Sequence, residues 1–263
     1  MIFETHAHYD DARFDVDRDA LLTGMRSAGV GKIVNVGADF QGCKDSLALA
    51  ERYEDVYAAL GIHPSEIGDL TEEHIRWIEE HASHEKVVAI GEIGLDYYWD
   101  KEKQVQQTQR EGFLRQMELA RRTGLPVIIH SRDAAEDTIR LMREIHAEEI
   151  PGVIHCYSYS PELAREFVKM GYYIGVGGVV TFKNARKLKD TVAEIGLEHI
   201  LLETDCPYMA PEPHRGKRND STNIRFVAEV IAELSGTSRE EVEAATWENA
   251  CRFYGVDGHK NCS

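Results

Sequence analysis

Short apolar runs alternate with longer amphipathic stretches along almost the whole chain. The apolar runs are residues 2–4, 33–36, 56–60, 87–90, 126–129, 153–154, 172–176 and 200–202. Most of them are continuously apolar rather than alternating in polarity, as is typical of parallel strands that are buried on both faces. The pattern therefore predicts eight buried strands.

The stretches between these runs carry the signals of helices. Residues 104–123 place apolar side chains at helical spacing, and Gly124 follows as a stop signal. Ser160 followed by Pro161 is typical of an N-cap and a first helical residue, and this helix should end near Gly171.

A last helix is predicted after Thr237, which has Glu240 at the spacing of a capping box, and should run to about residue 253. Strand followed by helix, repeated eight times in about 260 residues, predicts an α/β protein with a single-domain (β/α)8 TIM barrel. The barrel should span residues 1–257, and residues 258–263 should form a frayed tail. A doubly wound open sheet is the competing architecture, but it usually needs fewer strands.

Composition and charge narrow the choice of function. The net charge of −16 argues against a general DNA-coating protein, but it permits an enzyme with a small, locally cationic cleft. The five cysteines form no C-x-x-C pair, which indicates a reducing compartment. With no signal peptide and no apolar run of about 18 residues, we expect a cytoplasmic protein that does not associate with membranes. A monomer is the favoured state.

Histidines and carboxylates recur at the ends of the predicted strands, which a barrel would bring together at one mouth. They are His6, His8, Glu92, His130, His155 and Asp205. This mixture suits Zn²⁺, Mn²⁺, Fe²⁺, Co²⁺ or Ni²⁺ and is too rich in nitrogen for a dedicated Ca²⁺ site. His6 and His8 stand two residues apart, so they share one side of a strand, and Glu203 and Asp205 have the same relation.

Three further residues adjoin this set. Cys156 and Cys206 each follow a predicted ligand and should point to the other side of their strands, so we expect them to pack. His63 follows the third strand. A lone histidine in such a place is more often a core residue whose ring nitrogens are hydrogen-bonded than a ligand of metal or substrate. Both interpretations stay open.

Taken together, several motifs resemble those of the TatD family of metal-dependent hydrolases, a branch of the amidohydrolase-like barrels. They are THAH, GIHP, GEIGLDYY, PVIIHSRDA, HCYS and LLETDCPYMAPEPHRGKRN, and the resemblance runs from residue 2 to about residue 254. It implies a binuclear metal centre of two divalent ions, Zn, Mg, Mn, Ni or Fe, with the six residues above as ligands. It also implies a TatD-type deoxyribonuclease that trims DNA in a 3′–5′ exonuclease-like manner. The family usually has aspartate where this chain has Glu4, a change that could alter the hydrogen bonds behind His6 and His8.

The leading hypothesis is hydrolysis of a phosphodiester bond. Glu92 would bridge two ions, and Asp205 would act as ligand and general base. The expected substrate contacts are His63, Arg132, His214 and Arg215. The last two lie in the basic loop 213–218, and a solvated face explains that loop equally well. Tyr97, Tyr98 and Trp99 follow the fourth strand and could stack on a base or simply pack at the rim.

Two alternatives stay open. The same centre could hydrolyse an amide, a lactone or an aminoacyl ester, because a polarised carbonyl needs the same chemistry. More remotely, the chain could be a non-catalytic metal-binding scaffold for a protein or nucleic-acid partner.

Overall fold

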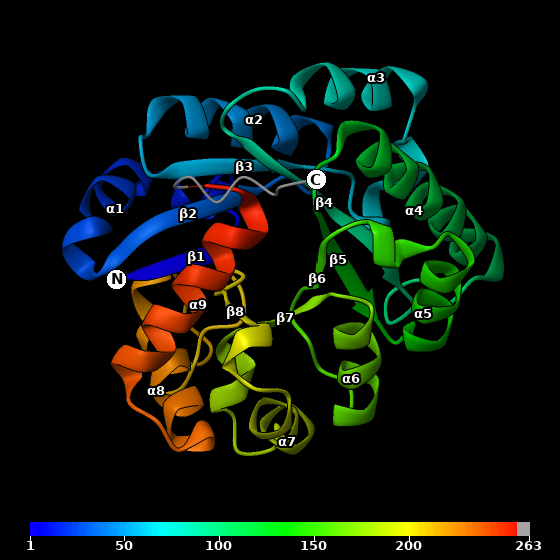
Figure 1. The fold of residues 1–263 in the computed structure, drawn as a ribbon. Helices are drawn as coiled ribbons and strands as arrows, with labels where there is room; N and C mark the ends of the chain where they lie inside the picture. Colours follow the sequence, from blue (N-terminus) through cyan, green and yellow to red (C-terminus); the bar gives the residue numbers. More distant parts are fainter. Residues whose placement is uncertain (257–263) are drawn as a thin grey trace.

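Eight parallel strands follow one another in chain order around a barrel, with helices on the outside (Figure 1). The strands are β1 (Ile2–Ala7), β2 (Val30–Val36), β3 (Val56–Leu60), β4 (Val87–Asp96), β5 (Val127–Arg132), β6 (Gly152–Ile154), β7 (Tyr173–Val176) and β8 (Ile200–Leu202). A parallel bridge between Ala7 and Cys206 closes the seam from β8 back to β1. The predicted TIM barrel is thus confirmed, and the open sheet is excluded. The computed structural model describes residues 1–256, so the predicted tail at 258–263 lies outside the described residues.

Every strand lies where an apolar run predicts one, but three strands extend into polar sequence. β1 continues past His6, β4 past Glu92 and β5 past His130. β4 and β5 stay paired as far as Asp96 opposite Arg132. An apolar run marks only the part of a strand that packs in the core. Pairing with the neighbouring strand carries the backbone further, so these functional side chains stand on rigid strands rather than on loops.

The helices surround the barrel (Figure 1); α1 to α7 lie between successive strands, and α8 and α9 follow β8. They are α1 (Arg18–Gly24), α2 (Phe40–Arg52), α3 (Glu72–His81), α4 (Lys103–Thr123), α5 (Ala135–Glu144), α6 (Pro161–Lys169), α7 (Arg186–Ile195), α8 (Ile224–Ser235) and α9 (Arg239–Tyr254). α4 ends at Gly124, whose φ of 71° is the left-handed C-terminal conformation that glycine favours. α6 begins at Pro161, as its sequence predicts.

The capping box of α9 lies one residue later than predicted. Ser238 Oγ accepts a hydrogen bond from the amide of Glu241 (3.2 Å), and Glu241 Oε2 accepts one from the amide of Ser238 (3.0 Å). Both Thr237 and Ser238 have glutamate three residues later, so the sequence allows either frame. The structure selects the second because the amide of Thr237 already donates to the carbonyl of Ala232 and completes the end of α8.

α9 lies across the N-terminal end of the barrel. Asn249 donates hydrogen bonds to the carbonyls of Leu197 (2.8 Å) and Ile200 (3.0 Å), which lie before and at the start of β8. The apolar side chains of one core cluster, among them Phe3 and Leu201, pack against Phe253 and neighbouring α9 residues. This end of the barrel is therefore covered, and the site must be sought at the C-terminal ends of the strands. No helix in residues 1–256 is long and apolar enough to cross a membrane.

Candidate metal centre

The first two predicted ligands, His6 and His8, converge with Glu92 and Asp205 at the C-terminal end of the barrel. The Nε2 atoms of His6 and His8 lie 3.1 Å apart. Glu92 Oε2 lies 3.3 Å from His6 Nε2 and 3.8 Å from His8 Nε2. Asp205 Oδ1 approaches His8 Nε2 to 3.4 Å. Two imidazoles and two carboxylates from β1, β4 and the segment after β8 thus face one small volume.

The other oxygen of Glu92 faces a second group of histidines. Oε1 lies 2.7 Å from His130 Nδ1 and 3.7 Å from His155 Nε2. Asp205 Oδ1 also lies 3.8 Å from His155 Nε2. Glu92 therefore stands between two histidine groups, in the bridging position that the sequence predicts for it.

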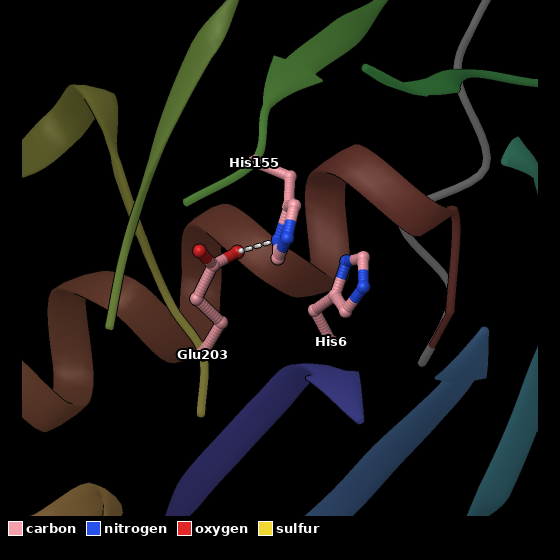
Figure 2. Close-up of side chains that lie close together, drawn as sticks. All are labelled: His6, His155 and Glu203. Atoms are coloured by element: carbon pink, nitrogen blue, oxygen red, sulfur yellow. Dashed lines mark hydrogen bonds and ion pairs between the residues drawn. The ribbon is translucent and has the colours of Figure 1, made fainter. Parts of the chain in front are cut away.

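Three of the four histidines are oriented by a carbonyl or carboxylate oxygen that contacts one of their ring nitrogens. His8 Nδ1 lies 2.8 Å from the carbonyl of Val36, and His130 Nε2 lies 3.1 Å from Asp96 Oδ2. His155 Nδ1 lies 3.1 Å from Glu203 Oε2, and a dashed line marks this contact in Figure 2. Histidines that bind metals usually hold their second nitrogen in this way, which fixes the ring and the nitrogen that is offered.

His6 differs from the other histidines, because its Nδ1 is buried and has no hydrogen-bond partner within residues 1–256. Its ring is positioned by stacking on His155, with ring centroids 3.6 Å apart (Figure 2). Packing rather than a hydrogen bond to Nδ1 therefore holds the far side of the His6 ring.

Asp96 is a partner that the sequence reasoning missed. It is buried and lies four residues after Glu92 in the motif GEIGLDYY. A signal was present, because residues an even number apart share one side of a strand. The apolar run, however, ended at residue 90, so the strand was expected to stop before Asp96.

The electrostatics of the centre fit a divalent cation. Burial would lower the pKa of His8, but Asp205, Glu92 and Asp10 outweigh burial and raise it to about 9. Burial also opposes protonation of His155, yet Glu203, Glu92 and Asp205 raise its pKa to about 10. The carboxylates thus attract positive charge into a buried site that is rich in imidazole. A divalent ion can take the place of the protons, because metal binding displaces them from its ligands.

The prediction that Cys156 packs away from the centre is wrong. β6 ends at Ile154, and Cys156 adopts a left-handed φ of 46°, so strand alternation no longer applies. Its Sγ, a nitrogen of His155 and an oxygen of Asp205 all lie within 4.8 Å of one another. Its amide donates to Glu203 Oε1 (2.6 Å). Cys206, in contrast, is buried as expected.

Asp205 likewise reaches the centre from an irregular backbone. β8 ends at Leu202, and Asp205 has a left-handed φ of 57°. Glu203 and Asp205 do share one side, as predicted, and both approach His155. They do so from a turn after the strand, and strand alternation does not place them.

Comparison with known proteins places this fold and site in a family. The family model described as TatD related DNase matches residues 3–255. The chain belongs to this TatD family. The uncharacterized metal-dependent hydrolase YabD of Bacillus subtilis is 45% identical, and the match covers 98% of this chain and 100% of the relative. The corresponding YcfH of Escherichia coli K12 is 34% identical over 99% of this chain and 98% of its own length.

A solved structure agrees with this assignment. The crystal structure of YjjV, a TatD homolog from Escherichia coli K12, superposes with a TM-score of 0.90 at 34% identity, covering 97% of this chain and 98% of that chain. The expected family is confirmed, and the TatD-family chain is a metal-dependent hydrolase.

In this TatD-family protein, His63 adjoins the centre. Its Nδ1 accepts the amide of Ser65 (3.1 Å), and its Nε2 lies 3.7 Å from Glu92 Oε1. Burial lowers the pKa of His63 to about 4, so the ring is neutral near pH 7. The structure therefore places His63 beside Glu92 and His130 rather than in the apolar core.

The cationic side chains of the basic loop 213–218 have different partners, although they look alike in sequence. Arg218 forms a bidentate ion pair with Asp17, with distances of 2.6 and 2.8 Å, and is neutralised there. The ring of His214 packs against Phe226 at 5.3 Å, and the Arg215 guanidinium lies 4.3 Å above the ring of Phe182. None of the hydrogen bonds or ion pairs within residues 1–256 joins His214 or Arg215 to the centre.

Proposed function

We propose that this TatD-family protein hydrolyses phosphodiester bonds in DNA, as a 3′–5′ exonuclease-like enzyme that uses divalent metal ions. The observation that carries the proposal is Glu92, whose two carboxylate oxygens face two separate groups of histidines at the barrel mouth. A carboxylate in this position can bridge two ions, and paired ions are a recurrent solution for phosphodiester cleavage. The description of the matching family model as DNase-related supports the same reaction.

The residues divide into two groups that would hold the ions. His6, His8 and Asp205 stand on one side of Glu92, and His130 and His155 stand on the other. A divalent cation bound there supplies Lewis acidity toward a phosphoryl oxygen and makes a water molecule more acidic. The same six residues suit Zn²⁺, Mn²⁺, Fe²⁺ and Ni²⁺ by their mixture of nitrogen and oxygen donors.

We assign Asp205 as the general base. Burial would raise the pKa of Asp205, but hydrogen bonding to His8 and the charge of His155 outweigh burial and lower the pKa below its ordinary value. Asp205 is therefore ionised at neutral pH and can accept a proton. Its side chain is 18% exposed, against 4% for Glu92, so it is the carboxylate within reach of a substrate.

We assign the remaining side chains of the mouth to substrate contacts. His63 is neutral and can hold a substrate without adding charge, while Arg215 and His214 would approach the phosphates that lie further from the cleaved bond. Arg132 lies at the end of β5, two residues beyond His130, and is the exposed cation closest in sequence to a proposed ligand.

The proposal is tested by metal reconstitution of purified protein. Wild type, Glu92→Ala and Asp205→Asn are stripped with a chelator, loaded with each metal and incubated with end-labelled single-stranded and duplex DNA. Glu111→Ala on the exposed face of α4 is the matched control. We expect wild type and the control to shorten DNA from its 3′ end, and both active-site variants to remain folded but inactive. Retained nuclease activity in purified Glu92→Ala would overturn the proposal.

A second candidate, the hydrolysis of an amide, a lactone or an aminoacyl ester, is favoured by one observation. The net charge of −16 gives no general attraction to a polyanion. The same protein preparations are therefore assayed on a panel of small amides and esters. Turnover that depends on Glu92 with these compounds, and none with DNA, would select this candidate instead.

A further inference from the structure

We propose that Tyr98, Trp99 and Arg132 form a subsite for one unpaired nucleotide beside the metal centre. The exposed indole of Trp99 would stack on the base, while Tyr98 would hold the guanidinium of Arg132, which would bind a phosphate. This inference rests on the proposed nuclease function and goes beyond it. The subsite would select single-stranded over duplex substrate, and the inference identifies the side chains that make the selection.

Two large aromatic side chains stand exposed at the barrel mouth. Trp99 is 68% exposed and Tyr98 is 42% exposed, and their ring centroids lie 4.8 Å apart in an edge-to-face arrangement. Scattered exposed apolar residues are common, but adjacent ones at the edge of a concave polar site often mark a binding surface. Both rings follow β4, the strand that carries Glu92.

Arg132 holds its guanidinium over these rings. Its Cζ lies 4.0 Å from the centroid of Tyr98 and 5.6 Å from that of Trp99. Within residues 1–256 its side chain donates no hydrogen bond and forms no ion pair, whereas Arg110 and Arg140 are paired with Asp137. An arginine that is held over a ring, with its side-chain donors free, is pre-organised for the oxygens of a phosphate.

Asp96 ties this group to the metal centre. Its Oδ1 accepts hydrogen bonds from the amides of Tyr98 (2.9 Å) and Trp99 (3.1 Å), while its Oδ2 lies 3.1 Å from His130 Nε2. One buried carboxylate thus sets the position of both the aromatic pair and a proposed metal ligand. The distance between the stacking surface and the reacting phosphate is therefore built into the fold.

The geometry favours an unpaired strand. An aromatic ring stacks only on the face of a base that is free, and in a duplex neighbouring bases cover both faces. Stacking also tolerates any base, because every base offers a π face. We therefore expect the subsite to prefer single strands and to show little preference for sequence.

The test measures binding of the nucleotide separately from cleavage of the phosphodiester bond. Trp99→Ala, Trp99→Phe, Arg132→Gln and the control Arg186→Gln, whose side chain is 91% exposed on α7, are compared with wild type. Binding of a labelled single-stranded oligonucleotide is measured by anisotropy on metal-free protein at several salt concentrations. Hydrolysis by the metal-loaded protein is measured on the oligonucleotide, on its duplex and on an abasic oligonucleotide of the same length, which keeps the phosphodiesters but has no base to stack.

We expect Trp99→Ala to weaken oligonucleotide binding and to raise KM by about 5- to 150-fold, the range of one stacked base. Trp99→Phe should recover most of the loss, and on the abasic oligonucleotide Trp99→Ala should show no such loss relative to wild type. Arg132→Gln should weaken binding and reduce the salt slope by about one unit, whereas Arg186→Gln should change neither.

Three results would overturn the subsite: unchanged oligonucleotide binding in Trp99→Ala, an equal loss on the abasic oligonucleotide, or a preference of wild type for duplex. Binding that depends on Trp99 without any DNA cleavage would support the subsite and overturn the proposed nuclease function. The two failures are thus distinguishable.

Discussion

Replacing Glu4 tests how the last seam of the barrel is held together. Glu4 is fully buried, and its Oε1 accepts hydrogen bonds from the amide of His6 (3.1 Å) and from the amide of Thr204 (2.9 Å). The first amide belongs to β1 and the second follows β8, so one carboxyl oxygen spans the two strands that close the barrel. Glu4, where the family resemblance leads us to expect aspartate, therefore supports the backbone around His6.

Removing that oxygen has a large expected cost. Glu4→Ala leaves two buried amides without a partner, and each unsatisfied donor costs about 1–3 kcal/mol, or about 2–6 kcal/mol together. Glu4→Gln keeps a carbonyl oxygen in the same place. We therefore expect Glu4→Ala to lower the free energy of unfolding well below that of Glu4→Gln.

The pH dependence of stability provides an independent signature. Burial raises the pKa of Glu4 from 4.5 to about 8, a shift that corresponds to about 5 kcal/mol. In the unfolded chain the carboxyl ionises near pH 4.5, while the folded protein keeps it protonated up to about pH 8. The stabilising contribution of Glu4 is therefore complete below pH 4.5, falls by about 1.4 kcal/mol per pH unit as the pH rises, and levels off above pH 8.

Glu4→Gln does not titrate, so its stability relative to wild type should rise across this window by about 5 kcal/mol. The assay is urea unfolding of chelator-treated protein, followed by circular dichroism between pH 4.5 and 8.5, for wild type, Glu4→Gln and Glu4→Ala. A difference between wild type and Glu4→Gln that does not change with pH would refute the raised pKa. Equal stability of the two variants would refute the role of the two amide contacts.

Three further predictions follow from the same geometry. Asp96→Asn should lower metal affinity by about 10- to 100-fold, measured by competition with a coloured chelator, because it weakens the partner that orients His130; unchanged affinity would contradict that role. Gly94→Ala should destabilise the fold by more than about 1 kcal/mol in urea unfolding, because Gly94 has a φ of 145° and a Cβ there would meet the carbonyl of His130, whereas Gly68→Ala, which meets nothing within 4 Å, should be close to neutral. Chelation should lower the melting temperature, and metal at about 100 times its Kd should restore about 2.7 kcal/mol in wild type but much less in Glu92→Ala. Equal stabilisation of both proteins by metal would place the ions elsewhere.

Much of the fold and of the candidate site was predictable from local sequence. A run such as 87–90 is apolar on both faces, and only a strand buried between barrel interior and helices needs that pattern. A barrel then brings the ends of its parallel strands together, so residues as distant as His6 and Asp205 were expected to meet, and they do. Which strand ends meet at the mouth follows from the order and direction of the strands.

The tertiary structure decided what pairs with what. Asp96 became a partner of His130 because β4 continues beside β5 after its apolar run has ended. Cys156 turned toward His155 and Asp205 because its backbone leaves the strand conformation.

The tertiary structure also decided which cationic side chains are neutralised. Arg132 and Arg218 look alike in sequence, but their partners differ. Arg218 is neutralised by Asp17, which lies 201 positions away, while Arg132 stacks on Tyr98 and keeps its donors free. Periodicity reports the environment of each residue along its own strand or helix, whereas partners depend on distances between segments that only the closed barrel brings together.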